Sequence, residues 1–347
     1  MTINRRQLLQ FSTAAAGLSL TGGLAPLNAF AATRMTGVTY LPKSYKALTF
    51  GSNGFVEHLR KNASAAIQVD YFDSGKLLKA GDQLPALRAG NIDFMFHTTS
   101  YITRSLPILG VLGLPGVAED LYRNPKRLAI GSPLFNLINE HLAKDDLYML
   151  SVGSGILEPE YLWAGKSSKI ESIADIKGKR VRVVGFEANG VIEGFGGATV
   201  NIPSSELYLA VQRKTVDAAV ANISTVIGRS LHEQLGSCYQ IPITAYGIGI
   251  FVKKSRWEKL PADVRKGMQA AAAWFDVESA KEANDKIYPN EYWPKMKQVG
   301  LKVIAPSQAD LIALDKAGAK VRATWVGEIG EAVGKKAIDL ALGKATS

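Results

Sequence analysis

Short apolar runs alternate with stretches of helical periodicity along most of the chain. Phe55 and Leu59 begin a four-residue spacing that is typical of one buried helix face, and residues 67–72 then alternate as a strand. Further strands are expected at 92–96, 147–152, 180–184, 199–202, 216–221, 247–253 and 301–304, with helical segments between them, and most of 261–296 and 308–342 is expected to be helical. Strands that alternate with helices predict an α/β fold with largely parallel sheets.

The N-terminal residues have a different pattern. Arg5 and Arg6 precede an apolar stretch that has no charge and several glycines, and Ala-Phe-Ala follows at 29–31 as a cleavage signal with small residues at 29 and 31. This order predicts a cleaved signal peptide over 1–31, and the adjacent arginines favour the twin-arginine type. A membrane anchor is the weaker alternative, because glycines and Pro26 interrupt a stretch that is short for a ~20-residue span. We therefore expect an exported, periplasmic protein.

Composition narrows the possible functions. The 347 residues are 47% hydrophobic and 21% charged, which is ordinary for a soluble globular protein. The net charge of +10 is spread along the chain without a basic cluster beside aromatic residues, so no nucleic-acid partner is expected. Cys238 is the single cysteine, which excludes an intrachain disulfide. The four histidines lack metal-ligand spacing and no nucleophile or phosphate-loop motif is present, so we expect no enzyme and no cofactor.

Several short motifs follow one another in a recognisable order. They include Asp-Ile-Lys-Gly-Lys-Arg-Val-Arg-Val at 175–183, Gly-Ala-Thr-Val-Asn-Ile-Pro at 197–203, the segments 205–212 and 215–219, and, nearer the N-terminus, 84–94 and 112–115. Trp-Glu-Lys-Leu-Pro at 257–261 precedes a long helical pattern. In this order, and with an export signal, the sequence resembles the solute-binding proteins of tripartite ATP-independent periplasmic (TRAP) transporters, of the dicarboxylate-transport type.

The resemblance implies a two-lobed, periplasmic-binding-protein-like α/β fold, with a ligand cleft between lobes joined by crossing strands and a long helix. Lobe I is expected at 32–153 and about 250–292, and lobe II at 154–249 and about 293–347. Such a protein, expected to be a monomer, closes around a small organic anion and delivers it to the small and large membrane subunits of a TRAP permease. Two alternatives stay open: an exported enzyme acting on an organic acid, and a binding protein of another transporter or sensor class.

The resemblance places the family's ligand-binding arginine at Arg182. A guanidinium offers a planar fork of donors that fits a carboxylate with two parallel hydrogen bonds. Alternation puts Arg180 on the same strand face, so the residues alone do not separate the two. The family's asparagine position falls on Ala221, with Asn222 next to it, and the choice between them stays open. The family's second arginine and its metal-supporting Glu-Trp pair are absent, so the substrate is open and no metal is predicted.

Other residues are expected in the cleft for weaker reasons. Aromatic residues at strand ends or loops suit mostly apolar pocket walls, although each could be a core residue; they are Tyr40, Tyr45, Tyr101, Trp163 and Phe186. His97 and Ser100 follow an expected strand at its carboxyl end, where ligands of open α/β sheets collect, and a plain loop role is the alternative for His97. Ser204 precedes a helix whose N-terminal amides favour anions, or it simply caps that helix.

Overall fold

The computed structural model describes residues 32–63, 66–153 and 155–344. The predicted signal peptide with Arg5 and Arg6 lies outside the described residues. Residues from Ala32 onward belong to one compact unit. Among the helices described, none combines the length and the apolar character that crossing a membrane requires.

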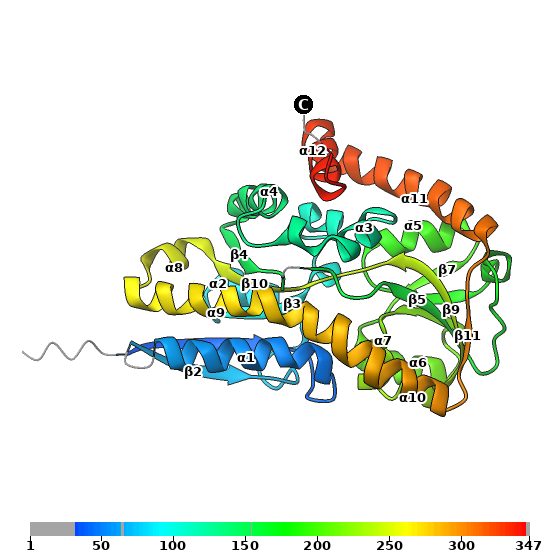
Figure 1. The fold of residues 1–347 in the computed structure, drawn as a ribbon, viewed down its shortest axis with the longest axis horizontal. Coiled ribbons are helices and arrows are strands. Elements are labelled where there is room, and N and C mark those ends of the chain that lie inside the picture. The colour runs from blue at the N-terminus through cyan, green and yellow to red at the C-terminus, as the bar shows by residue number, and fades with distance from the viewer. Residues whose placement is uncertain (1–31, 64–65, 154, 345–347) are drawn as a thin grey trace, which may run out of the picture. The chain divides into compact units, whose positions relative to one another are not determined.

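The strands form two sheets (Figure 1). The first has the order β2-β1-β3-β10-β4. Its strands are β1 (Thr33–Thr39), β2 (Ile67–Phe72), β3 (Phe94–Thr98), β4 (Leu147–Ser151) and β10 (Ile248–Lys253). β1 pairs in parallel with β2 and β3, whereas β10 runs antiparallel to β3 and β4. We call this sheet and its helices the first lobe; the helices are α1 (Lys46–Asn62), α2 (Ala80–Ala89), α3 (Val117–Arg123) and α4 (Pro133–Leu142).

The second sheet has the order β11-β9-β5-β8-β6-β7. Its strands are β5 (Glu160–Gly165), β6 (Arg180–Val183), β7 (Ala198–Asn201), β8 (Ala218–Ala221), β9 (Leu235–Thr244) and β11 (Lys302–Ile304). β6 is parallel to β7 and β8, so the carboxyl ends of these three strands meet at one edge. This sheet and its helices form the second lobe; the helices are α5 (Phe186–Gly194), α6 (Ser204–Gln212) and α7 (Ile223–Gly228).

The chain passes between the two lobes at several places. The connection from β9 to β10 takes only residues 245–247, and residues 152–159 connect β4 to β5. A long helical region then runs from α9 (Ala262–Lys281) through the π-helical segment η7 (Glu282–Tyr292) to α10 (Trp293–Gln298). α9 packs on α1 and β4 of the first lobe, and η7 packs on α7 of the second (Figure 1). These are the crossing strands and the long helix that the family resemblance implied.

The C-terminal helices also contact both lobes. α11 (Gln308–Ile329) packs on α5, and its Trp325 donates a hydrogen bond from Nε1 to the Pro107 carbonyl oxygen of the first lobe, 2.7 Å away. α12 (Glu331–Ala341) packs on α3 and α4. α12, which the sequence assigned to lobe II, therefore lies against helices of the first lobe. The boundaries of the two lobes stay a prediction.

Candidate ligand-binding site

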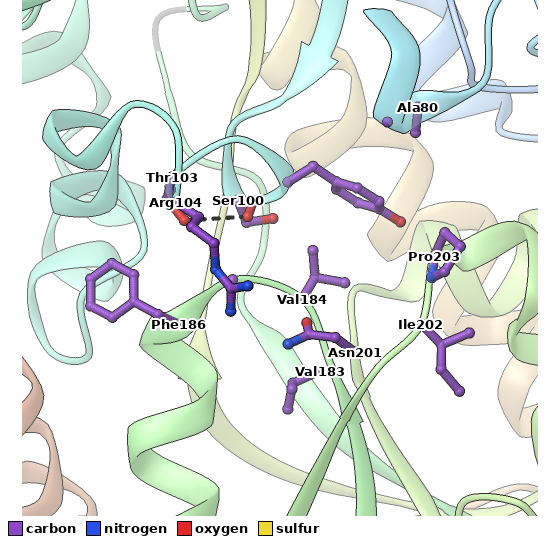
Figure 2. A pocket seen from close by; sticks show the side chains of 13 residues that line it. Ala80, Ser100, Thr103, Arg104, Val183, Val184, Phe186, Asn201, Ile202 and Pro203 are labelled. Carbon is purple, nitrogen blue, oxygen red and sulfur yellow. Dashed lines mark hydrogen bonds between the residues drawn. The ribbon is translucent and has the colours of Figure 1, made fainter. Parts of the chain in front are cut away.

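Two adjoining cavities lie between the lobes. A cleft of about 380 Å³ has first-lobe walls from Ala80 and the Ser100–Arg104 segment and second-lobe walls from the ends of β6 and β7 (Figure 2). The second cavity has a volume of only about 10 Å³, and we call it the chamber. Ser100, Tyr101 and Val184 line both cavities. The chamber therefore adjoins the cleft, and its volume is room for about one water molecule.

Polar side chains line most of the chamber. Besides Leu41 and Val184 its walls are Tyr40, Tyr45, Thr98, Ser100, Tyr101, Glu160, Arg182, Ser204, Thr225 and Tyr246. Burial raises the pKa of Tyr40, Tyr45 and Tyr246 above its ordinary value, so these phenols stay neutral at any physiological pH. Arg182 is therefore the permanent positive charge of the lining, and Glu160 is its one carboxyl group.

Arg182 is buried and firmly held. Its side chain is on β6 at the edge where the parallel strands end, and only 2% of the residue is exposed. Nε donates to the carbonyl oxygen of Ile202 at 2.8 Å, and Nη1 donates to that of Val220 at 3.0 Å. These carbonyl groups are neutral, and a buried charge is costly without an opposite charge near it. These hydrogen bonds fix the position of the guanidinium, but none of the groups that accept them carries a negative charge that would compensate it.

Two donors of the second lobe converge on one oxygen atom of the first lobe. The Tyr101 hydroxyl oxygen accepts a hydrogen bond from the backbone N–H of Ser204 at 2.9 Å and one from Arg182 Nη2 at 3.4 Å. Ser204 is the first residue of α6, whose N-terminal amides carry positive partial charge. A guanidinium and a helix N-terminus that point at the same place make a favourable position for a carboxylate oxygen.

Arg180 and Arg182 have different environments although two residues separate them. The Arg180 side chain is 48% exposed and forms an ion pair with Asp217, with 2.9 Å between Nη2 and Oδ1. Asp217 also accepts from the Arg180 backbone N–H at 2.8 Å, at the start of β6. Of the two arginines Arg182 lines the chamber, and its assignment as the ligand-binding arginine stays a prediction.

Six other predicted residues line the cavities, among them Tyr45 and Tyr101 in the chamber. Tyr40, Ser100 and Ser204 line the chamber, and Phe186 lines the cleft (Figure 2). The Ser100 hydroxyl is buried and has no hydrogen-bond partner among the described residues, so it is available to a ligand. Their role as ligand contacts stays a prediction.

His97, Trp163 and Asn222 line neither cavity. Both His97 ring nitrogens lie 3.0 Å from backbone carbonyl oxygens, and burial lowers the pKa of the ring, which keeps it neutral. Trp163 stacks on Trp293 with 5.8 Å between ring centroids, and its indole N–H donates to the Ala221 carbonyl oxygen at 2.8 Å. In this structure these side chains serve the packing of the fold.

The amide of Asn222 is used within the second lobe. Its Oδ1 accepts from the Ser224 backbone N–H at 2.8 Å and caps α7, while its Nδ2 donates to the Glu158 carbonyl oxygen at 2.6 Å. Ala221 is fully buried in β8. Neither residue therefore presents an amide to the chamber.

Glu160 and Tyr246 are chamber residues that sequence reasoning did not select. Glu160 opens β5, an element without a clear apolar alternation, and Tyr246 lies in the short connection between the sheets. Burial raises the pKa of Glu160 to about 7, against the opposing effects of the Arg182 charge and of the Asn222 backbone N–H. One indirect indication of Glu160 was present in the sequence. It lies in the segment where related proteins have a second arginine and this chain has none.

Arg104 adds a cation at the mouth of the cleft. It is an exposed residue of the first lobe, and Figure 2 shows its side chain extending toward Val184 and Phe186 across the cleft. In residues 32–63, 66–153 and 155–344, no cluster of three or more His, Cys, Asp or Glu side chains could hold a metal ion.

Comparison with known proteins agrees with this geometry. The model of the family described as bacterial extracellular solute-binding protein, family 7 (DctP) matches residues 42–326. The chain belongs to this family. Among curated relatives of this family 7 protein, a solute-binding protein of Albidiferax ferrireducens is 24% identical over 242 residues, which are 66% of this chain and 68% of that one. The C4-dicarboxylate-binding periplasmic protein DctP of Rhodobacter capsulatus is 24% identical over 244 residues, covering 68% and 71% of the two chains.

Solved structures share the fold of this family 7 protein. The Bordetella pertussis extracytoplasmic solute receptor DctP6, which binds pyroglutamic acid, matches with a TM-score of 0.79 and 18% identity over 90% of this chain and 100% of its own. A TRAP periplasmic solute-binding protein from Rhodoferax ferrireducens with bound malonate matches with a TM-score of 0.76 and 20% identity, over 89% and 97%. The predicted family and the two-lobed fold are confirmed, and the protein is a member of a family of extracellular solute-binding proteins.

Proposed function

We propose that this protein is a periplasmic receptor that binds a small organic carboxylate at Arg182 and delivers it to the membrane subunits of a TRAP permease. The observation that carries the proposal is the convergence of Arg182 Nη2 and the Ser204 N–H on the Tyr101 hydroxyl oxygen. Relatives point to the same ligand chemistry, since their names or bound ligands include C4-dicarboxylates, pyroglutamate, malonate and glucuronate.

On binding, a ligand carboxylate replaces the Tyr101 hydroxyl as the group that accepts hydrogen bonds from Arg182 and Ser204. Tyr101 belongs to the first lobe, so separation of the lobes withdraws its hydroxyl and leaves the Arg182 and Ser204 donors exposed at the end of the cleft. A ligand carboxylate then accepts from both, with two oxygens in place of one and a full negative charge in place of a neutral hydroxyl. Closure excludes water, which strengthens these charge-assisted hydrogen bonds.

The connections between the lobes suit such a motion. Residues 245–247 form a short segment between the sheets, of the kind that absorbs backbone rotation in hinge closure. Arg104 at the cleft mouth attracts anions toward the chamber. Export by the twin-arginine signal, a monomeric state and the absence of catalysis belong to the same proposal.

Identification of the bound compound tests the proposal. Mass spectrometry of small molecules released from the freshly purified protein is expected to show an organic acid. A panel of organic acids is then screened by thermal shift, where a ligand at 100 times its Kd adds about 2.7 kcal/mol of stability. The absence of any co-purified acid, together with the absence of any stabilising acid in the panel, would overturn the proposal.

A further inference from the structure

Glu160 and Arg182 lie at the same end of the strands of the second sheet, but they do not form an ion pair with each other. β8 lies between their strands, β5 and β6. The hydrogen bonds of Arg182 go to two backbone carbonyls and to Tyr101, and Glu160 is not among its partners in the described chain. The guanidinium still acts on Glu160 at longer range, since its charge lowers the pKa of the carboxyl. The chamber thus presents a cation and a carboxyl group as two separate contact points.

The Glu160 carboxyl has unused capacity to accept hydrogen bonds. Only 4% of the residue is exposed, so water does not solvate it freely. The Asn222 backbone N–H is the hydrogen-bond donor that acts on its pKa, whereas a carboxylate can accept about four hydrogen bonds. A largely buried carboxylate with few donors is costly, and the cost is relieved by a further donor that enters the chamber.

We propose that Glu160 accepts a hydrogen bond from a ligand N–H while Arg182 binds the ligand carboxylate, so that the ligand is a small monocarboxylate carrying an amine or amide N–H. This rests on the proposed function and specifies the ligand class of the same site. A dicarboxylate would bring its second negative charge toward Glu160. Because burial raises the pKa of Glu160 to about 7, the carboxyl is ionised and repels that charge mainly above this pH, so the selection against dicarboxylates is expected to be strongest there. The site therefore selects against dicarboxylates as well as for N–H donors.

Pairs of probes that differ in one atom test the proposal. Pyroglutamate has a ring N–H where 5-oxotetrahydrofuran-2-carboxylate has an oxygen atom, and proline and tetrahydrofuran-2-carboxylate form a second pair. Calorimetry with the full-length mature protein is expected to show at least tenfold tighter binding of the N–H member in one or both pairs, and weaker binding of malonate. Equal binding within both pairs, or tightest binding of malonate, would overturn the proposal.

Two methionine variants assign the preference to one side chain. Glu160→Met keeps the length of the side chain and removes both acceptor oxygens, which a glutamine would not, and it is expected to reduce the preference for the N–H member to less than threefold. Glu158→Met is the matched control, because Glu158 is also a mostly buried glutamate with a pKa raised to about 7, but it accepts from Trp293 Nε1 at 3.0 Å and does not line the chamber. A preference that survives in Glu160→Met, or that is lost equally in both variants, contradicts the proposal.

The failure of this inference can be told from failure of the proposed function. If carboxylates bind and Arg182→Ala abolishes their binding, but the N–H and oxygen members bind alike, only the role of Glu160 is wrong. If none of the probes binds, the acid released from the purified protein decides: an acid without any N–H overturns the inference. If no acid binds or co-purifies, the proposed function itself is wrong.

Discussion

The two sides of the chamber differ in chemistry. The second lobe supplies the charged groups, namely Arg182, Glu160 and the N-terminus of α6, whereas the first lobe supplies neutral hydroxyls and rings such as those of Tyr40 and Tyr101. Charged groups determine which ions bind, and the Arg182 guanidinium is held here by two hydrogen bonds to backbone carbonyls of its own lobe. The difference suggests that the second lobe recognises the ligand and that the first lobe closes over it.

The largest expected effect comes from removing the charge on the second-lobe side. Arg182→Ala is expected to weaken binding of the identified carboxylate by ~2–5 kcal/mol, because a buried ion pair loses one partner. Arg182→Lys is expected to lose less, since an ammonium keeps the charge without the planar two-bond geometry. Calorimetry with the compound found in the purified protein measures both.

Arg180→Ala is the control for this comparison. Its side chain pairs with Asp217 at the exposed start of β6, so affinity is expected to stay within twofold of the wild-type value. Unliganded melting temperatures check that the variants fold. If Arg182→Ala bound the ligand almost as tightly as the wild type, the charged groups of the second lobe would not be what recognises the ligand.

The boundary between the two sides contains a buried carboxyl group, that of Glu187 in the first turn of α5. A Cβ placed at Gly110 of the first lobe would lie 3.0 Å from Glu187 Oε1, so this carboxyl packs tightly against the opposite lobe. Burial raises the pKa of Glu187 to about 8, despite the hydrogen bond from the Thr103 side chain that opposes the shift, and the charges of Glu160 and Glu328 raise it further.

The raised pKa predicts lower stability at higher pH. Between the ordinary pKa of a glutamate and pH 8 the folded protein holds a proton on Glu187 that the unfolded chain has lost. The free energy of unfolding therefore falls as pH rises, by about 1.4 kcal/mol per pH unit from this group. Thermal unfolding at pH 6, 7 and 8 measures the slope, and Glu187→Gln is expected to flatten it. An unchanged slope in that variant would show that Glu187 is not responsible.

The neutral side can be tested through the hydroxyl of Tyr101. In this structure it occupies the Arg182 and Ser204 donors that the ligand is proposed to take. Tyr101→Phe removes the competitor and keeps the ring, so affinity is expected to rise by up to about tenfold. Calorimetry of this variant and of Arg182→Ala is expected to show changes in ligand affinity of opposite sign, a gain for Tyr101→Phe and a loss for Arg182→Ala. A clear loss of affinity in Tyr101→Phe would instead place the hydroxyl in contact with the bound ligand.

Sequence reasoning succeeded where local pattern and motif agreed. Strand 67–72 was predicted with the bounds of β2, and β6 was predicted from the alternation of valine and arginine at 180–183. It missed β1, β5 and β9. β5 is buried on both faces apart from one half-buried residue, and such strands do not alternate clearly, whereas the burial of β1 and β9 alternates over only part of each strand. α1 also begins at Lys46, well before the predicted start at Phe55, with Gly51 and Gly54 placed where α9 packs closely against it.

Only those residues of the site that belong to a family motif could be predicted with a specific role. Arg182 was selected by the resemblance, and its burial comes from neighbouring strands that the motif includes. Trp163 was expected at the cleft, but it is covered by Trp293, a residue of α10 far along the chain. Glu160 opens a strand, where a charged residue commonly faces solvent. Long-range packing decides both cases, and a single sequence does not show it.

The smallest expected effect concerns Asn222, which lies beside the charged side without lining the chamber. Its side chain caps α7, and replacing an N-cap asparagine by alanine costs ~1 kcal/mol of stability. Because its backbone N–H, which acts on Glu160, is kept in Asn222→Ala, ligand affinity is expected to change less than threefold. Chemical denaturation and calorimetry of the same variant separate the two quantities. A large loss of affinity at unchanged stability would make Asn222 a ligand contact, as the resemblance suggested, and would extend the charged side to the end of β8.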